Sequence, residues 1–357
     1  MEDIKEIFKE KQFDAKTLQC LENAINEFDE LFGKYFSRQE VINRIKDRIH
    51  RVIWKEGLAK KEKCFGEWTP SSGTIRIDSN LSRQRLGDVF FHELIHAIRT
   101  DDHGNIGFTR TYEIDGFDYK LNVGNAIEEG FTQYVTNIRN KKFRNIITGN
   151  GYKIEEDFLS IFEIDRDRLL EIGFTAPHTI REEIALAMGG STSLKNITDV
   201  TRLLSAMDAR LFYEHDEERT IEEKESYMRD IWEIVKSSYI SIKGGALKSP
   251  RDLCNSLIIC NELSMFFALS FDHDALELRL NSEDVLVMLN EIARKGINID
   301  EAVKELREGE YNYLSTQLAI AKRRQDIGIN IYDEHNEEHM PNSYGKNYTT
   351  IGEEYDR

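Results

Sequence analysis

Residues 90–98 read Phe90-Phe91-His92-Glu93-Leu94-Ile95-His96-Ala97-Ile98, an HExxH pattern inside an apolar run. Residues four apart on a helix lie on the same face, so His92 and His96 can present their imidazoles to one metal ion. Glu93 lies beside them, where a carboxylate can take a proton from a metal-bound water and later give it to a leaving group. The apolar neighbours predict a buried helix, in which two histidines and a glutamate would be costly without a shared role.

A third protein ligand is expected from residues 124–135, which predict a second helix. Asn125 is a good N-cap, and Glu128 stands three residues later, where a capping-box side chain bonds back to the N-cap amide. Glu129 is then the freer carboxylate, and Gly130 after it allows a close approach to the metal and to the neighbouring helix. We therefore favour Glu129 as the third ligand and keep Glu128 as an alternative.

A weaker candidate for the third ligand is Asp102, six residues after His96. This shorter HExxHxxGxxD arrangement needs a glycine turn three residues after the second histidine, and the chain has Arg99 there. Asp101 or Asp102 could instead accept a hydrogen bond from a ligand histidine.

Together, HELIHAI at 92–98 and IEEGFTQYVT at 127–136 resemble the gluzincins, zinc peptidases whose third ligand is a glutamate on a separate helix. The similarity is greatest to bacterial members with an N/E-E-G-[FI]-T-[EQ] helix, and extends more distantly to thermolysin-like enzymes and zinc aminopeptidases. It covers roughly residues 64–140. In those families the ligand is the glutamate directly before the small residue, which corresponds to Glu129. Thermolysin-like enzymes carry an acid one turn later to orient a zinc-bound histidine, whereas this chain has Gln133, a weaker acceptor.

The resemblance implies an α+β fold, with a zincin-like core made of a small sheet and the HExxH helix, to which the later sequence adds a mainly helical C-terminal lobe. It also implies one Zn²⁺ held by His92, His96 and Glu129, and hydrolysis of a peptide bond by metal-activated water with Glu93 as the general base. Two alternatives stay open. The chain could be a zincin-fold binding or sensing protein without turnover, or a host-directed metallopeptidase toxin.

Two hairpins are expected around the HExxH helix. Residues 73–78 alternate and are rich in β-branched side chains, so they predict a strand that could pair with residues 64–68. In zincins the strand just before the active helix runs along the sheet edge, where an extended peptide can add to it; an ordinary structural strand is the alternative. Residues 107–121 predict the second hairpin. Candidates for stabilising an oxyanion are the phenols of Tyr112, Tyr119 and Tyr152.

Four parts are expected along the chain: N-terminal helices over 1–60, a catalytic core over 61–190, a helical lobe over 191–332 and a disordered tail over 333–357. Apolar periodicity predicts N-terminal helices over about 2–31 and 38–56. Ser249-Pro250 predicts a helix start, and Ser282 predicts another helix that Gly296 closes. We expect the helical lobe to form the other wall of the active-site cleft.

Composition narrows the class of partner. The net charge of -17 argues against nucleic acid or an anionic membrane as a partner and would favour neutral or basic over acidic peptides. A peptide or protein is the substrate that the resemblance implies. No stretch is long and apolar enough to span a bilayer, and the acidic N-terminus does not resemble a secretory signal. The four cysteines lack disulfide-framework or zinc-finger spacing. We therefore expect a cytoplasmic protein, with signal-less export as the alternative.

Overall fold

The structure is a computed structural model that describes residues 4–62, 64–113, 120–144, 159, 162–215, 219–268 and 279–327. Within these residues the fold is α+β, with many helices and two small sheets. The chain divides into two compact units, and the boundary falls after Ile242, inside helix α11 (Ile221–Ala246). This boundary lies well beyond residue 191, where the sequence predicted the helical lobe to begin.

The N-terminal region contains α1 (Ile4–Ile7), η1 (Lys9–Lys11), α2 (Ala15–Phe32), α3 (Arg38–Arg48) and strand β1 (Arg51–Lys55). Asp14 caps α2, and Ser37 with Glu40 forms a capping box at the start of α3. The predicted single helix over 2–31 is therefore interrupted.

The predicted helix over 38–56 is wrong beyond Arg48, because Ile49 is extended and residues 51–55 pair with a neighbouring strand. Val52, Ile53 and Trp54 favour a strand intrinsically, and the tertiary pairing overrides the helical spacing of their apolar side chains.

A three-stranded sheet has the order β1-β3-β2, with β2 at Gly66–Thr69 and β3 at Thr74–Asp78. β2 and β3 pair antiparallel, which confirms the first hairpin, and β1 runs parallel to β3. The strand that directly precedes the HExxH helix, β3, is thus central, which agrees with the alternative of an ordinary structural strand and not with an edge strand. β2 is the edge strand that borders this helix. Short helices α4 (Leu58–Lys61) and η2 (Pro70–Ser72) connect the strands.

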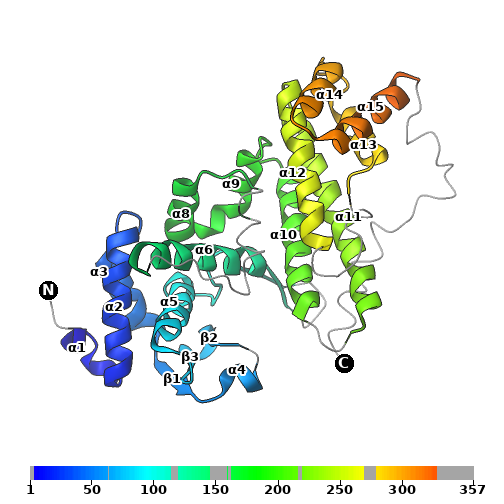
Figure 1. Cartoon of the computed structure of the whole chain (residues 1–357). Helices are drawn as coiled ribbons and strands as arrows, with labels where there is room; N and C mark the ends of the chain where they lie inside the picture. The colour runs from blue at the N-terminus through cyan, green and yellow to red at the C-terminus, as the bar shows by residue number, and fades with distance from the viewer. Residues whose placement is uncertain are drawn as a thin grey trace. The chain divides into compact units, whose positions relative to one another are not determined.

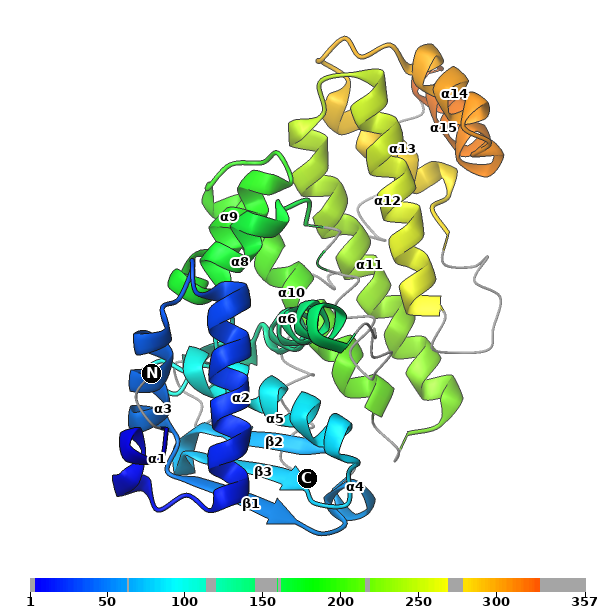
Figure 2. The ribbon, with the colours of Figure 1, turned by 60° about the vertical axis from the view of Figure 1, so that its left-hand side comes forward.

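Helix α5 (Arg83–Arg99) carries the HExxH residues and packs on β2 and β3. Its other side contacts α6 (Asn125–Arg144), so α5 lies between the sheet and α6 (Figures 1 and 2). Between the two helices in sequence, β4 (Arg110–Glu113) and β5 (Lys120–Val123) pair antiparallel and confirm the second hairpin.

The remaining helices of the first unit are α8 (Arg166–Thr175), η3 (Pro177–Thr179), α9 (Ile180–Ala187) and α10 (Leu194–His215). α8 reaches the core through Phe174, whose ring contacts Phe28 of α2 and Phe131 of α6. α10 packs against α6 and β5. These contacts hold α6 against α8 and α10 and thereby position the helix that carries Glu129.

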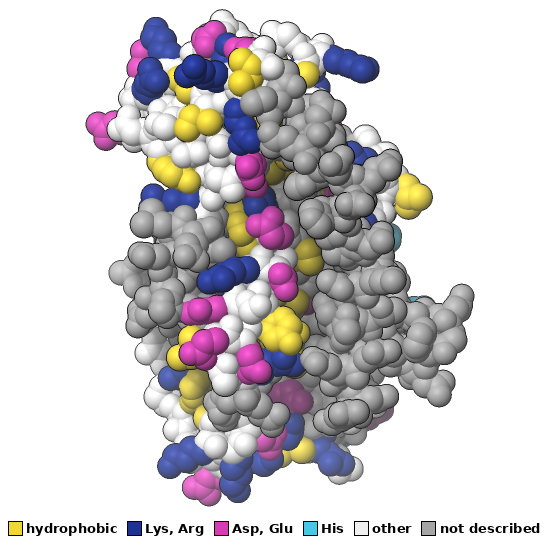
Figure 3. Space-filling model, turned by 90° about the vertical axis from the view of Figure 1, so that its right-hand side faces the viewer, with side chains coloured by type: hydrophobic (Ala, Val, Ile, Leu, Met, Phe, Trp, Pro, Cys, Tyr) yellow, Lys and Arg dark blue, Asp and Glu magenta, His cyan; other side chains and the backbone are white. Residues whose placement is uncertain are grey.

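The second unit contains the end of α11, α12 (Pro250–Ala268) as far as Met265, α13 (Ser282–Ile292), α14 (Ile299–Glu308) and α15 (Asn312–Asp326). The helix starts predicted at Pro250 and Ser282 are confirmed. Residues 333–357, predicted to be disordered, lie outside the described residues. No described helix has the length and apolar character needed to cross a membrane. On the face in Figure 3, acidic and basic side chains of the described residues are interspersed.

Candidate metal centre

Helix α5 presents its polar residues from an otherwise apolar, buried segment. Ser82 caps its start by accepting from the amide of Arg85, and every residue from Phe90 to Arg99 is buried. At the end of the helix the hydroxyl of Thr100 donates to the carbonyl of His96 at 2.9 Å and accepts from the Trp68 indole at 2.8 Å. This contact ties the last turn to the edge strand β2.

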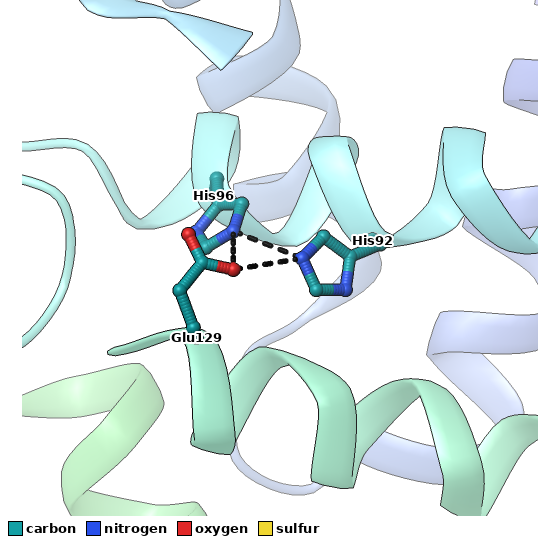
Figure 4. A group of neighbouring side chains, drawn as sticks. All are labelled: His92, His96 and Glu129. Atoms are coloured by element: carbon teal, nitrogen blue, oxygen red, sulfur yellow. Dashed lines mark hydrogen bonds and ion pairs between the residues drawn. The ribbon is translucent and has the colours of Figure 1, made fainter. Parts of the chain in front are cut away.

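Three potential ligand atoms converge between α5 and α6. His92 Nε2 lies 3.2 Å from His96 Nε2 and 3.2 Å from Glu129 Oε2, and His96 Nε2 lies 3.4 Å from the same carboxylate oxygen. Figure 4 shows the two imidazoles of α5 and the carboxylate of α6 pointing toward one another. Among the described residues, this is the group whose geometry could hold a metal ion, and it contains the three ligands predicted from the sequence.

The group is open on one side. The side chain of Glu129 is 26 % exposed and that of His92 is 11 % exposed, whereas His96 is 6 % exposed. A further ligand could therefore approach from solvent past Glu129 and His92.

The histidines and carboxylates of this group shift one another's pKa values. Burial alone would lower the pKa of His96, but the carboxylates of Glu129 and Glu128 outweigh it and raise that pKa to about 10. Burial alone would raise the pKa of Glu129, but His96 and His92 outweigh it and hold that pKa well below its usual range. Glu129 is therefore an anion, as a carboxylate ligand must be.

Glu128 does not act as the predicted helix cap. Its carboxylate is buried and faces α5, where Oε1 accepts from His96 Nδ1 at 3.1 Å and from Arg99 Nη1 at 2.6 Å. Oε2 accepts from the backbone amide of Phe108 at 3.0 Å. Burial alone would raise the pKa of Glu128, but the charge of Arg99 and the hydrogen bond from His96 outweigh it. The net effect lowers the pKa below its usual value, so the group is ionised.

The start of α6 is capped from a distant helix instead. Asp208 of α10 accepts hydrogen bonds from the amides of Gly124 and Ala126, both at 2.7 Å. Gly124 has φ +102°, a conformation that a residue with a side chain rarely adopts, and this turn brings the first amides of α6 toward α10. Asp208 thus frees Glu128 to point into the interior.

Glu93 is buried next to the edge strand. A Cβ on Gly66 of β2 would lie 2.8 Å from Glu93 Oε1 and 2.5 Å from Val89, so only glycine fits against this carboxylate. Burial raises the pKa of Glu93, while the nearby imidazoles of His92 and His96 lower it less. The charges of His92, His96 and Glu129 act on the Glu93 carboxylate, but Glu93 does not belong to the group of potential ligands.

The remaining predicted site residues have other partners. Asp101 accepts from the amides of His103 and Asn105 in a turn, and the exposed Asp102 pairs with Arg48. Gln133 donates to Asn137 at 3.0 Å within α6. Tyr112 lies in β4, and its side chain is outside the described part of the structure, as are Tyr119 and Tyr152, so the three oxyanion candidates stay predictions.

Sequence reasoning missed the residues that support the ligands: Gly66, Arg99, Glu128 as a histidine partner, and Asp208. Arg99 and Glu128 carried a usable signal, since Arg99 lies one helical turn after His96 and Glu128 precedes the expected ligand. Charged residues are seldom buried without a partner, so Arg99 and Glu128, both next to predicted ligands on buried helices, could have been predicted to form an ion pair. Asp208 carried none, because it lies 82 residues from Ala126.

Comparisons with known proteins assign no family. Protein-family models, curated proteins and solved structures all gave no match to this chain.

Proposed function

We propose that this protein is a zinc-dependent peptidase in which His92, His96 and Glu129 hold the ion. The separation of 3.2 to 3.4 Å between the three ligand atoms carries the proposal. Ligands about 2.0–2.1 Å from a tetrahedral zinc lie roughly 3.3 Å from one another, so the observed triangle fits one face of such a tetrahedron.

The donor set favours zinc over other common ions. Two imidazole nitrogens and one carboxylate oxygen are a frequent set in catalytic zinc sites, which keep the fourth position for water. Calcium and magnesium prefer oxygen ligands alone. A zinc ion held here would act as a Lewis acid and would lower the pKa of a coordinated water.

Glu93 is the residue that would move the proton. It is buried beside the ligand triangle, and its pKa is raised by that burial, which brings a carboxylate closer to the range in which it exchanges protons near neutral pH. Glu93 would take a proton from the attacking water and deliver it to the leaving amine.

A peptide substrate is supported by strand β2. This strand is at the edge of its sheet in the described part of the chain, and it runs directly beside Glu93 through Gly66. An extended peptide that paired with β2 as a further strand would place its backbone next to the proposed base. The peptide bond is thus the bond that the arrangement could best present to Glu93.

The test is Glu93→Gln, measured by zinc content and by cleavage of a diverse peptide library. We expect the variant to keep about one zinc per chain while cleavage falls ~10²-fold or more. Glu22→Gln, at an exposed position of α2, is the matched control and should cleave like the wild type.

Equal cleavage by Glu93→Gln and the wild type would refute the mechanism. Bound zinc without cleavage by either protein would support the alternative of a binding or sensing module. Selective cleavage of a host protein by the wild type would instead place the peptidase among toxins.

A further inference from the structure

We infer that Arg99 is a positioning residue of the metal centre, which acts through Glu128 to fix the orientation and the tautomer of His96. The inference rests on the proposed function, because its consequence is the affinity of the three ligands for zinc. It assigns a role in that function to a residue that does not itself reach the ligand triangle.

Arg99 is held in place by contacts from several elements. It lies one turn after His96 on α5, and its Nη1 donates to Glu128 Oε1 of α6 at 2.6 Å. Its Nε donates to the carbonyl of Gly173 in α8 at 2.9 Å. The guanidinium lies 4.6 Å from the ring centroid of Phe108 and 4.1 Å from that of Phe131. Arg99 is thus held by α6, α8 and two aromatic rings.

Arg99 keeps the buried Glu128 carboxylate charged. Both side chains of the pair are only 2 % exposed, and a buried carboxylate stays charged only when paired. Besides Arg99, the Glu128 oxygens lie within hydrogen-bonding distance of His96 Nδ1, the Phe108 amide and the Thr132 hydroxyl. An ionised carboxylate only accepts hydrogen bonds, so each of these neighbours must donate to it.

His96 responds to this pair through its ring protons. Its Nδ1 holds a proton toward Glu128, so the proton that the charged ring would release on binding a metal is the one on Nε2, and the lone pair of the resulting neutral ring is then on Nε2. Nε2 is the atom that lies 3.2 Å from His92 Nε2 and 3.4 Å from Glu129 Oε2. The Arg99–Glu128 pair therefore selects the tautomer that a metal at the triangle requires.

The surroundings leave the pair little freedom to shift. A Cβ on Gly107 would come within 2.3 Å of Glu128 Oε2 and 2.5 Å of Arg99 Nη2, and Gly107 has φ +50°. Glycine at this position thus lets the backbone pack directly against Glu128 and Arg99. An alternative orientation of Glu128 would displace this turn.

A purely structural ion pair and a positioning pair respond differently to neutral replacement. Buried ion pairs can often be replaced by neutral side chains of similar volume with little loss of stability, whereas removal of one partner leaves an uncompensated charge. A double substitution that neutralises both residues should thus restore the fold. It should not restore the negative charge that orients His96.

The experiment compares the wild type, Arg99→Met, Glu128→Gln and the double variant. Competitive titration with a chelator gives the zinc affinity, and unfolding of the metal-free proteins gives their stability. We expect each single variant to lose both, and the double variant to recover its stability while binding zinc roughly 10- to 100-fold more weakly than the wild type.

A second buried pair on the same two helices is the matched control. Arg139 Nη1 donates to Asp88 Oδ1 at 2.9 Å, while Glu27 also pairs with Arg139 and Arg144 also pairs with Asp88. We expect Arg139→Met with Asp88→Asn, which leaves Glu27 and Arg144 without these partners, to lower stability but to keep the wild-type zinc affinity. Wild-type zinc affinity in the neutral Arg99/Glu128 double variant would overturn the inference, as would an equal loss in the control pair.

Arg99→Lys covers the case in which the double variant does not fold. Lysine keeps the charge but cannot bridge Glu128 and the Gly173 carbonyl at once, because it lacks the planar fork of arginine. We expect a folded protein with several-fold weaker zinc binding, and unchanged affinity would contradict the inference. If the wild type itself binds no zinc, the proposed function fails, and this result is distinct from every outcome above.

Discussion

Helices α5 and α6 of the first unit differ from helices α13 to α15 of the second in what they bury. The buried residues of α13 to α15 are apolar apart from Ser315. In contrast, α5 and α6 together bury many polar or charged side chains, namely Asp88, His92, Glu93, His96, Arg99, Glu128, Thr132, Gln133, Thr136, Asn137, Arg139 and Asn140. Burial of such groups is unfavourable unless each has a hydrogen-bond or ion-pair partner. The stability of α5 and α6 therefore depends on polar pairing, whereas that of α13 to α15 depends on apolar packing.

The charged and capping contacts of α13 to α15 lie at helix ends and on the surface. Asn281 forms a capping box with Asp284, Asn298 accepts from the amide of Glu301, and Lys322 pairs with the exposed Asp326. Contacts of this kind define helix boundaries and contribute modestly. In α5 and α6, charged contacts such as Arg99–Glu128 and Arg139–Asp88 connect the two helices inside the core. The interior of these two helices is thus organised around polar partners, whereas α13 to α15 are organised around apolar packing.

The largest expected effect is on packing in the second unit. Leu289 of α13 is fully buried, so Leu289→Ala should lower the free energy of unfolding by about 2–5 kcal/mol. Zinc affinity of the folded variant should be unchanged, because α13 carries none of the site residues. Unfolding curves and zinc titration on one preparation measure both quantities. A loss of zinc affinity in the folded variant would break the contrast between the two regions.

A smaller effect, dependent on pH, is expected at Asp208. Burial outweighs its amide hydrogen bonds and raises its pKa from 3.8 to about 6. A carboxyl group whose pKa rises on folding stabilises the fold most below pH 3.8, and this contribution is lost as the pH rises to about 6. The unfolding free energy of the wild type relative to Asp208→Asn should thus fall by on the order of 2–3 kcal/mol across this window.

Urea unfolding of both proteins between roughly pH 3 and pH 7, which brackets the titration, provides the measurement. A constant difference in unfolding free energy across that range would show that Asp208 does not titrate there. The cap of α6 would then be a carboxylate at all these pH values.

The smallest effect is expected at the surface of the second unit. Lys322 of α15 lies 2.7 Å from Asp326 and 3.7 Å from Asp300, whose side chains are largely exposed. Lys322→Ala should change the free energy of unfolding by less than about 1 kcal/mol. A loss above roughly 2 kcal/mol, measured by chemical denaturation, would show that ion pairs contribute to this unit as they do in α5 and α6.

Local patterns predicted much of the fold and the ligand triangle. The spacing of His92 and His96 is a property of one helix, and the hairpins and the helix starts at Pro250 and Ser282 depend on neighbouring residues. β1 was missed because its apolar residues continue the helical spacing of α3, and pairing with β3 decided its conformation.

The support of the site could not be predicted in the same way. Whether Glu128 bonds its own helix end or His96 depends on how α6 packs against α5, and on Asp208, which occupies the helix end from α10. Gly66 lies against Glu93 only because β2 is the edge strand beside α5. These contacts join segments that are distant in the sequence, so a pattern within one segment does not specify them.

We propose that His92, His96 and Glu129 form one zinc site, and competitive zinc titration of Glu129→Ala is the decisive measurement. The wild type should bind about one zinc per chain, and Glu129→Ala, left with two histidines, should bind it more than about 100-fold less tightly. Asp102→Ala is the control, because this exposed carboxylate pairs with Arg48, and it should keep the wild-type affinity. Loss of zinc in Asp102→Ala with wild-type binding in Glu129→Ala would contradict the account.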